Sequence, residues 1–261
     1  MILHSAVDNV DASQLIRKLS EVEQDSHKCR IPCLDHKSPE FYWIFKNMDF
    51  ESWRSASAGE LWLSGPEDRN LDQFASYIID QAKMNSSNTQ EYVLYFFCGT
   101  AEQLSGTTVL VNAFLDQLIG YLPPVDRALV ISVFLRTILD LMLGKDATLL
   151  EWISDLKDSS PDLIVQQMVE LSSGEEQLEA LKAVLELKQF HIECLCVIVA
   201  GLDRVLQTEK SEFVRDILLL VTYLQESPWK VKVLLTSLPR DEFKFLLNGL
   251  PSIEHDKERK G

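Results

Sequence analysis

The chain has 261 residues, and 25 Lys and Arg against 40 Asp and Glu give it a formal net charge of −15 at pH 7. This excess of negative charge argues against a nucleic-acid partner, since affinity for a phosphate backbone comes from Lys and Arg that replace counterions. Anionic membrane surfaces are disfavoured for the same reason. Five cysteines without regular spacing are more typical of a reducing compartment than of a disulfide scaffold.

The first ten residues show no secretory signal, because they lack a basic start, an apolar stretch and a small-residue cleavage site. The two most apolar stretches, 105–125 and 127–143, are interrupted by polar side chains and predict core helices, since a membrane span needs about 20 apolar residues. We therefore expect a cytoplasmic protein without membrane contact.

The N-terminal 38 residues are predicted to form one amphipathic helix, 11–24, and a polar connector, 26–38. The connector holds two His and two Cys within ten residues, a pattern with some likeness to a zinc site. Because this is not the spacing of a common zinc finger, partly exposed thiols are the favoured interpretation, and metal binding stays open. The four residues are His27, Cys29, Cys33 and His36.

A block of six large aromatic residues follows between positions 41 and 53. So many rings cannot all face solvent without leaving a large exposed apolar patch. The block is therefore predicted to pack against the main body or against a partner. Its members are Phe41, Tyr42, Trp43, Phe45, Phe50 and Trp53.

Four short apolar runs, 61–64, 92–98, 194–200 and 231–236, have strand character. They are apolar at consecutive positions, as in strands that are buried on both faces of a parallel sheet. Helical patterns lie between them, which predicts an α/β fold: a P-loop NTPase-like, mostly parallel sheet with helices on both faces. The helices are expected at 71–84, 106–121, 126–143, 147–156, 161–171, 175–188 and 212–226.

The predicted organisation has three parts. An N-terminal helix and linker cover residues 1–38, and the α/β domain covers 39–250 with an all-helical insert at about 126–190. The polar segment 251–261 is expected to be disordered.

The turn after the first strand is the natural place for a ligand, because doubly wound sheets bind ligands at the carboxyl ends of their strands. A phosphate-binding loop there would need a second glycine, a lysine and a hydroxyl in the order G-x-x-x-x-G-K-[S/T]. The turn keeps the first glycine, Gly65, but lacks the rest.

Several segments together resemble the P-loop domain of fungal NACHT-type STAND ATPases, the group with a nephrocystin-3-like N-terminal domain. The similarity covers roughly 30–239 and depends on the order and spacing of its pieces. These are Arg30-Ile31, Phe41-Tyr-Trp-Ile-Phe45, Phe50-Glu-Ser-Trp53, Leu61-Trp-Leu-Ser-Gly65, Tyr95-Phe-Phe97, Leu110 to Leu122, Val197 to Arg204 and Lys232 to Ser237.

The resemblance implies a degenerate nucleotide site. Asn70, Leu71 and Asp72 stand where the family has its second P-loop glycine, its lysine and its Mg²⁺-holding hydroxyl. In the Walker B segment, Ala200 replaces the Mg²⁺-proximal aspartate and Arg204 the last acidic residue, which leaves Asp203 alone. The sensor serine is Ser237, and Leu238 replaces the arginine that often follows it.

These replacements predict a non-catalytic pseudo-NTPase without a cofactor. Glu67, Asp68 and Asp72 would repel a triphosphate. Asp68, Asn70 and Asp72 are good caps for the following helix, so the domain could stay folded without a nucleotide. We expect a protein-interaction or regulatory module whose partner is another STAND protein or a pathway enzyme, docked through the aromatic block or the helical insert.

Two alternatives from other classes stay open. One is a residual nucleotide binder without hydrolysis. The other is an enzyme or accessory protein of a biosynthetic pathway that uses the fold for unrelated chemistry, because fold does not fix function. A hydrolase would need a base next to a serine such as Ser64 or Ser105, and the sequence offers no nucleophile motif around either one.

Overall fold

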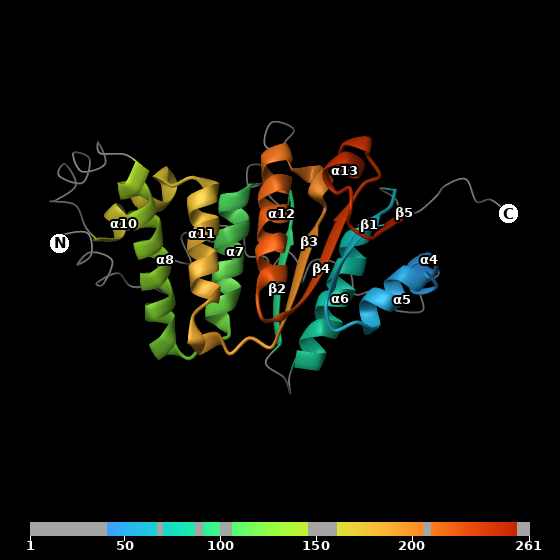
Figure 1. Cartoon of the computed structure of the whole chain (residues 1–261), viewed down its shortest axis with the longest axis horizontal. Helices are drawn as coiled ribbons and strands as arrows, with labels where there is room; N and C mark the ends of the chain where they lie inside the picture. The colour runs from blue at the N-terminus through green and yellow to red at the C-terminus, as the bar shows by residue number, and fades with distance from the viewer. Residues whose placement is uncertain are drawn as a thin grey trace. The chain divides into compact units, whose positions relative to one another are not determined.

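The computed structural model describes residues 41–66, 70–86, 91–99, 106–145, 161–205 and 210–254. Several predictions lie outside these residues: the helices at 11–24 and 147–156, the connector with His27, Cys29, Cys33 and His36, and the charges of Glu67 and Asp68. The chain divides into two compact units. Within the described residues, the α/β unit holds 41–106 and 192–254, and the helical unit holds 107–191 (Figure 1).

The α/β unit contains a five-stranded, all-parallel sheet in the order β2-β3-β4-β1-β5. The predicted α/β fold with a mostly parallel sheet is therefore confirmed. The five strands are β1 Gly59–Ser64, β2 Glu91–Phe97, β3 Cys194–Ala200, β4 Lys230–Ser237 and β5 Ser252–Glu254.

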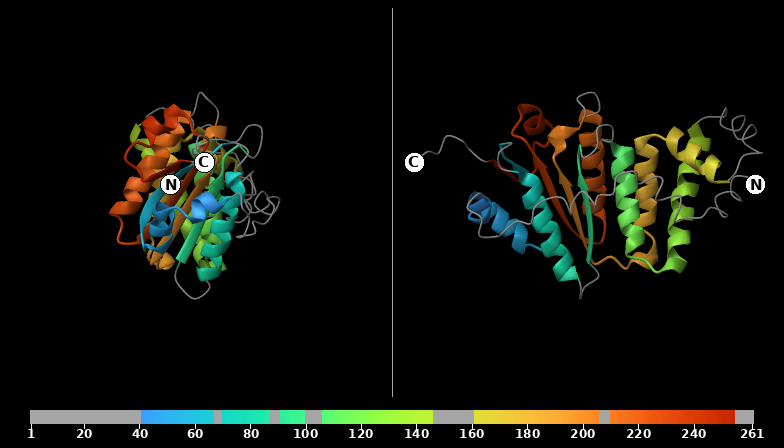
Figure 2. Two further views of the ribbon diagram at one scale, coloured as in Figure 1. Left: turned by 90° about the vertical axis from the view of Figure 1, so that its right-hand side faces the viewer. Right: turned by 180° about the vertical axis from the view of Figure 1, so that it is seen from behind.

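Helices cover both faces of this sheet. In the left view of Figure 2, α12 and α13 lie on one side of the strands and α4, α5 and α6 on the other. Strands buried on both faces explain the uninterrupted apolar runs in the sequence. These elements are α4 Tyr42–Phe45, α5 Met48–Ser55, α6 Leu71–Ser86, α12 Lys210–Glu226 and α13 Asp241–Leu246, with a short 3-10 helix, η4, at Leu202–Arg204.

The aromatic block forms α4, α5 and the turns beside them, and it packs against α6. The Phe74 ring of α6 lies 5.9 Å from the Phe41 ring, 5.7 Å from the Phe45 ring and 5.4 Å from the Phe50 ring, measured between centroids. Phe41, Phe50 and Phe74 are fully buried. The prediction that the block packs against the main body is confirmed for these rings, whereas Tyr42 is 44% exposed.

The second face of the sheet packs against α12, where the Phe96 ring of β2 lies 6.3 Å from the Phe213 ring. α12 also contacts α13 through Lys210, whose ammonium is 3.0 Å from a carboxylate oxygen of Glu242 and lies over the Phe243 ring. The carboxyl ends of β1, β3 and β4 are thus held between two packed helical layers.

Strand β5 differs from the expectation that residues 251–261 are disordered. Leu63 and Ser64 of β1 pair with Ile253 and Glu254 in parallel register, and the Ile253 side chain is 2% exposed. A single apolar residue among polar neighbours was too weak a pattern to predict a strand. The strand moves β1 from the edge of the sheet to its interior.

The helical unit consists of α7 Thr107–Gly120, α8 Pro124–Lys145, α10 Pro161–Leu171 and α11 Gly174–Leu185, followed by the 3-10 helix η3 Lys188–Phe190. α11 begins with a capping box in which the Ser173 hydroxyl oxygen and the Glu176 carboxylate each accept a backbone N–H of the other residue. The insert expected at 126–190 lies inside this unit, which begins earlier, at Thr107. None of the helices in the described ranges is long and apolar enough to cross a bilayer.

Candidate functional site

A pocket of about 220 Å³ lies at the carboxyl ends of β1, β3 and β4. These three strands are neighbours in the sheet, because β4 lies between β3 and β1. The turn after β1, the first turn of α6 and η4 complete the wall. The lining residues are Gly65, Pro66, Asn70, Leu71, Asp72, Gly201, Asp203, Arg204, Thr236, Ser237 and Leu238.

The pocket brings together seven of the eight residues that the sequence assigned to a degenerate nucleotide site. The eighth, Ala200, is the last residue of β3 and adjoins the lining residue Gly201. The seven come from positions up to 172 apart in the chain, and they are Gly65, Asn70, Leu71, Asp72, Asp203, Arg204 and Ser237.

An ion pair between Arg204 and Asp72 crosses one wall of the pocket. Nη1 of Arg204 donates to Oδ2 of Asp72 at 2.7 Å, and Nη2 donates to Oδ1 at 2.7 Å. Nη2 also lies 3.3 Å from the carbonyl oxygen of Ala200. Burial lowers the pKa of the Arg204 guanidinium, but its hydrogen bonds to Asp72 outweigh that effect and raise the pKa. Two parallel charged hydrogen bonds make this the strongest kind of side-chain pair.

Two glycines give the Arg204 side chain its room. Gly201 has a φ of +76°, and a Cβ at that position would collide with the guanidinium. Gly99, with a φ of +67°, would place a Cβ 2.7 Å from the Cβ of Arg204. Both glycines follow strand ends, so the arginine lies against the backbone that leaves β2 and β3. Its position is a built feature of the fold and not that of a freely moving surface side chain.

A second set of hydrogen bonds leads from Asp203, the neighbour of Arg204 in the chain, to the interior of the sheet. The Leu238 N–H donates to Oδ1 of Asp203 at 2.8 Å. The Ser237 hydroxyl donates to the Leu238 carbonyl at 3.0 Å and accepts the indole N–H of buried Trp62 at 2.9 Å. The predicted sensor serine is therefore fully engaged inside the protein.

Among the described residues, the first glycine of the predicted phosphate loop has another partner, and a lysine is missing from the pocket. The Gly65 N–H donates to the Ser237 carbonyl at 3.3 Å, and no lysine is among the residues that line the pocket. In the part of the chain that the structure describes, no group of three or more His, Cys, Asp and Glu side chains is arranged to hold a metal ion.

The structure also gives little support to nucleophilic catalysis at the pocket. No histidine or cysteine is among its lining residues. Ser64 is fully buried, and its hydroxyl has no hydrogen-bond partner among the described residues. Burial raises the pKa of the nearby Cys98 thiol far above its usual range, which keeps this thiol protonated and unreactive. Ser105 lies outside the described residues.

Asp72 has a different role from the one that the sequence suggested. We expected its carboxylate to help cap α6, but the structure pairs both carboxylate oxygens with Arg204. Asn70 precedes the helix with a φ of 41°, and its carbonyl oxygen accepts the Gln73 N–H at 2.9 Å. The physical reason is that a guanidinium 132 positions away offers two charged hydrogen bonds, more than a single backbone amide can.

Sequence reasoning missed Trp62, Gly99, Gly201 and Thr236 at this site. The two glycines were detectable, because each directly follows an apolar run where a strand was expected to end. Thr236 accepts the Gly201 N–H with its hydroxyl oxygen at 3.0 Å. That bond and the bond from Trp62 to Ser237 join residues far apart in the chain, so no local sequence pattern predicts them.

Comparison with protein-family models, with curated proteins and with solved structures gives no match for this chain. The resemblance to NACHT-type STAND ATPases is therefore a prediction that these comparisons do not test.

Proposed function

We propose that this protein is a pseudo-NTPase related to NACHT and STAND proteins, which acts as a non-catalytic interaction or regulatory module. The observation that supports the proposal most directly is the ion pair between Arg204 and Asp72. By the resemblance, Asp72 stands at the position of the hydroxyl that holds Mg²⁺, and Arg204 stands at the last acidic position of Walker B. A guanidinium and a carboxylate thus bind each other where a relative would hold its metal.

Electrostatics weigh against a nucleotide in this pocket. A triphosphate would lack the metal ion, and it would also lack the lysine, whose charged hydrogen bonds contribute about 1.5–3 kcal/mol each. It would also approach the carboxylates of Asp72 and Asp203. Two like charges about 4 Å apart repel by about 4 kcal/mol at an effective dielectric constant near 20. A nucleotide would therefore compete with Asp72 for Arg204, and it would find no lysine among the residues that line the pocket.

A thermal-shift experiment tests this part of the proposal. The full chain is heated with ATP, ADP or GTP, each with and without Mg²⁺, and we expect no rise in Tm. A ligand present at 100 times its Kd would add about 2.7 kcal/mol of stability, which for a chain of this size is a rise of several degrees. Such a rise with any of the nucleotides would overturn the pseudo-NTPase proposal.

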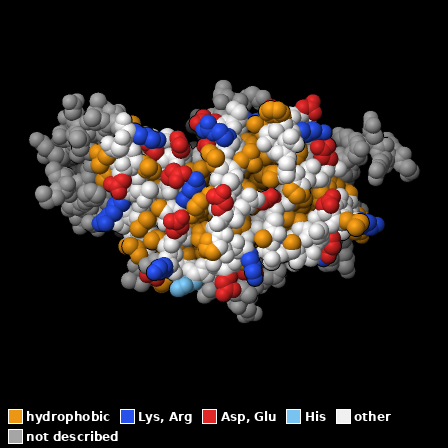
Figure 3. All heavy atoms as spheres, in the orientation of Figure 1, with side chains coloured by type: hydrophobic (Ala, Val, Ile, Leu, Met, Phe, Trp, Pro, Cys, Tyr) orange, Lys and Arg blue, Asp and Glu red, His pale blue; other side chains and the backbone are white. Residues whose placement is uncertain are grey.

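A role in protein interactions is supported by what the pocket lacks and by the charge of the chain. The polar groups of the site are largely paired with each other, and the net charge of −15 favours association with a basic surface. On the face shown in Figure 3, Lys and Arg side chains are scattered among Asp and Glu, as on an ordinary protein surface. The predicted partners are another STAND protein or a pathway enzyme.

Affinity capture from native cytosol, followed by mass spectrometry, tests the interaction role. We expect one protein to be recovered with the tagged chain in repeated captures and to be lost at high ionic strength, because screening weakens contacts between exposed charges. Repeated recovery of the tagged chain alone would count against this role.

A further inference from the structure

The pocket at the strand ends holds one carboxylate, that of Asp203, which has a charged neighbour in Arg204 but no ion pair among the described residues. Arg204 neutralises Asp72 through two hydrogen bonds. Asp203 lines the same pocket, and its Oδ1 accepts the Leu238 N–H at 2.8 Å. Within the described residues, its second oxygen, Oδ2, accepts no hydrogen bond and Asp203 has no ion pair. Among the described lining residues, the charges of Asp72, Asp203 and Arg204 therefore sum to −1.

Apolar residues form another part of the wall, and of these the Leu71 side chain packs into the core and is 9% exposed. Pro66 and Leu71 lie on the side of α6, and Leu238 follows β4. A ligand that suits this pocket has an aliphatic stem to cover these residues and a cationic head to reach Asp203. Lysine and arginine side chains have this build, since they bury their methylene stems along apolar surfaces while the charged group finds a polar partner.

We propose that the pocket receives a lysine or arginine side chain of a protein partner, with its charged head on Oδ2 of Asp203. This inference rests on the proposed function, because only a protein that leaves the pocket free of nucleotide can use it in this way. The net charge of the chain would steer a basic partner towards it. The site thus predicts one property of the partner, which is a basic side chain exposed on the partner's surface.

An anionic occupant fits the same walls poorly. It would face Asp203, and it would compete with Asp72 for the charge of Arg204. Asp72 is attached to the same chain and held at 2.7 Å, so it competes as an intramolecular ligand at high effective concentration. A cationic group meets neither obstacle, because Arg204 already has a partner and Asp203 has an oxygen to offer.

The test uses the full chain, uniformly labelled with ¹⁵N, and capped amino acids as probes. N-acetyl-arginine methylamide and N-acetyl-lysine methylamide represent the basic side chain, and N-acetyl-glutamate methylamide is the acidic control. The Leu238 amide is the local readout, because it donates to the carboxylate that the probe is expected to contact. Putrescine is included as a free amine that is not part of a protein.

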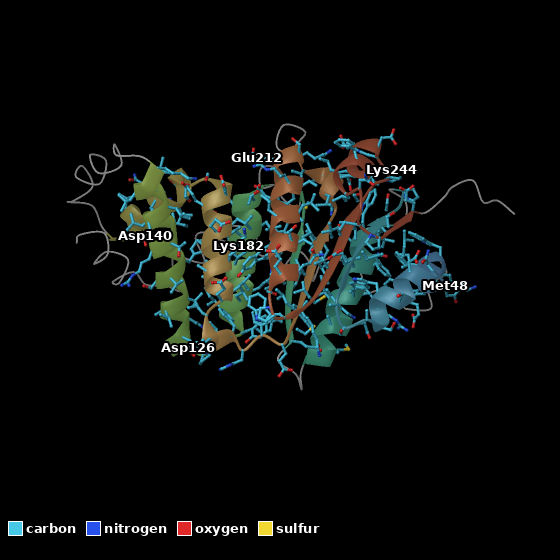
Figure 4. All side chains as sticks on the ribbon, in the orientation of Figure 1. Met48, Asp126, Asp140, Lys182, Glu212 and Lys244 are labelled. Carbon is cyan, nitrogen blue, oxygen red and sulfur yellow. The ribbon has the colours of Figure 1, made fainter. Side chains whose placement is uncertain are left out.

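We expect both basic probes to shift the Leu238 amide resonance saturably, with millimolar Kd values, and the acidic probe to leave it unchanged. Asp203→Asn should weaken binding about tenfold, the loss of one charge-assisted hydrogen bond, while the asparagine carbonyl still accepts the Leu238 N–H. Asp140→Asn is the matched control, since it removes the same charge from an exposed residue of α8 outside the pocket (Figure 4), and it should bind as the wild type does.

Three results would overturn the inference. The first is that neither basic probe shifts the Leu238 amide of the wild-type protein, which decides the matter even if Asp203→Asn fails to fold. The second is equal binding of the probes by wild type and Asp203→Asn. The third is a Kd for putrescine about tenfold below those of the capped amino acids, which would assign the site to a free amine. Nucleotide binding in the thermal-shift experiment would instead overturn the proposed function itself.

Discussion

The α/β unit and the helical unit use polar groups in different ways. In the α/β unit, the polar contacts at the carboxyl ends of the strands join residues far apart in the chain, such as Asp72 with Arg204 and Trp62 with Ser237. In the helical unit, the polar contacts around the start of α11 are mostly local, as in the capping box of Ser173 and Glu176. Local polar contacts thus stabilise the start of α11, whereas contacts between distant residues assemble the pocket.

A substitution in the apolar core should change stability most, although this core has no part in the polar network of the site. Phe74→Ala removes a fully buried ring that contacts Phe41, Phe45 and Phe50. We expect a loss of about 3–5 kcal/mol in the free energy of unfolding, because the cavity cannot close completely. Urea unfolding measures the loss, provided that the slope m of the unfolding free energy against urea concentration is the same for variant and wild type.

Met84→Ala on the same helix is the control, because this side chain is 68% exposed, and its stability should stay within about 0.5 kcal/mol of wild type. If Phe74→Ala lowered the free energy of unfolding by less than about 1 kcal/mol, the packing of the aromatic block against Phe74 would not be the rigid support for the pocket that its burial indicates.

An intermediate effect is expected from the pair that spans the pocket. Arg204→Ala leaves Asp72 without its partner and should cost about 1–3 kcal/mol. A double-mutant cycle with Asp72→Ala should give a coupling energy of about 0.5–3 kcal/mol, as for side chains in direct contact. Both are measured by denaturant unfolding.

Arg54→Ala is the control, because it breaks an exposed ion pair with Glu51 on α5. It should leave the free energy of unfolding nearly unchanged, since most surface ion pairs contribute little to stability. Additive effects of Arg204→Ala and Asp72→Ala would contradict the view that the two residues form one unit at the site.

The smallest effect is expected in the helical unit and depends on pH. Burial raises the pKa of Glu176, but hydrogen bonds from Ser173 and Lys145 outweigh it, so the pKa lies below its usual 4.5. The carboxylate therefore stabilises the fold above pH 4.5, and this contribution is lost as the pH falls through the lowered pKa. Glu176→Gln should cost about 1 kcal/mol at neutral pH, as for other caps.

Thermal unfolding across the acidic range checks this prediction, and the difference between Glu176→Gln and wild type should shrink at the lowest pH. Glu179→Gln is the control, because that side chain is 48% exposed and pairs only at the surface with Lys182. A difference that stayed constant with pH would mean that the carboxylate charge of Glu176 has no part in the cap.

The sequence predicted the four longer strands and most of the positions that line the pocket, but not how those positions interact. Uninterrupted apolar runs identify buried strands, and each of the four lies within one or two residues of its predicted bounds. Asp72 and Arg204 were both assigned to the site, yet their pairing was not foreseen, because opposite charges 132 positions apart carry no local signal. β5 and α13 were missed because three and six residues show too little periodicity.

The place of β1 in the sheet has a consequence for how the protein is made. Its neighbours β4 and β5 begin at Lys230 and Ser252, whereas β1 ends at Ser64. A ribosome that adds about 5–20 residues per second needs roughly 10 to 30 seconds to make the chain in between. During that time the nascent β1 has two unpaired edges and an apolar sequence, which is the kind of segment that self-associates. Slow or stalled translation after Ser64 should therefore favour aggregation of the newborn chain.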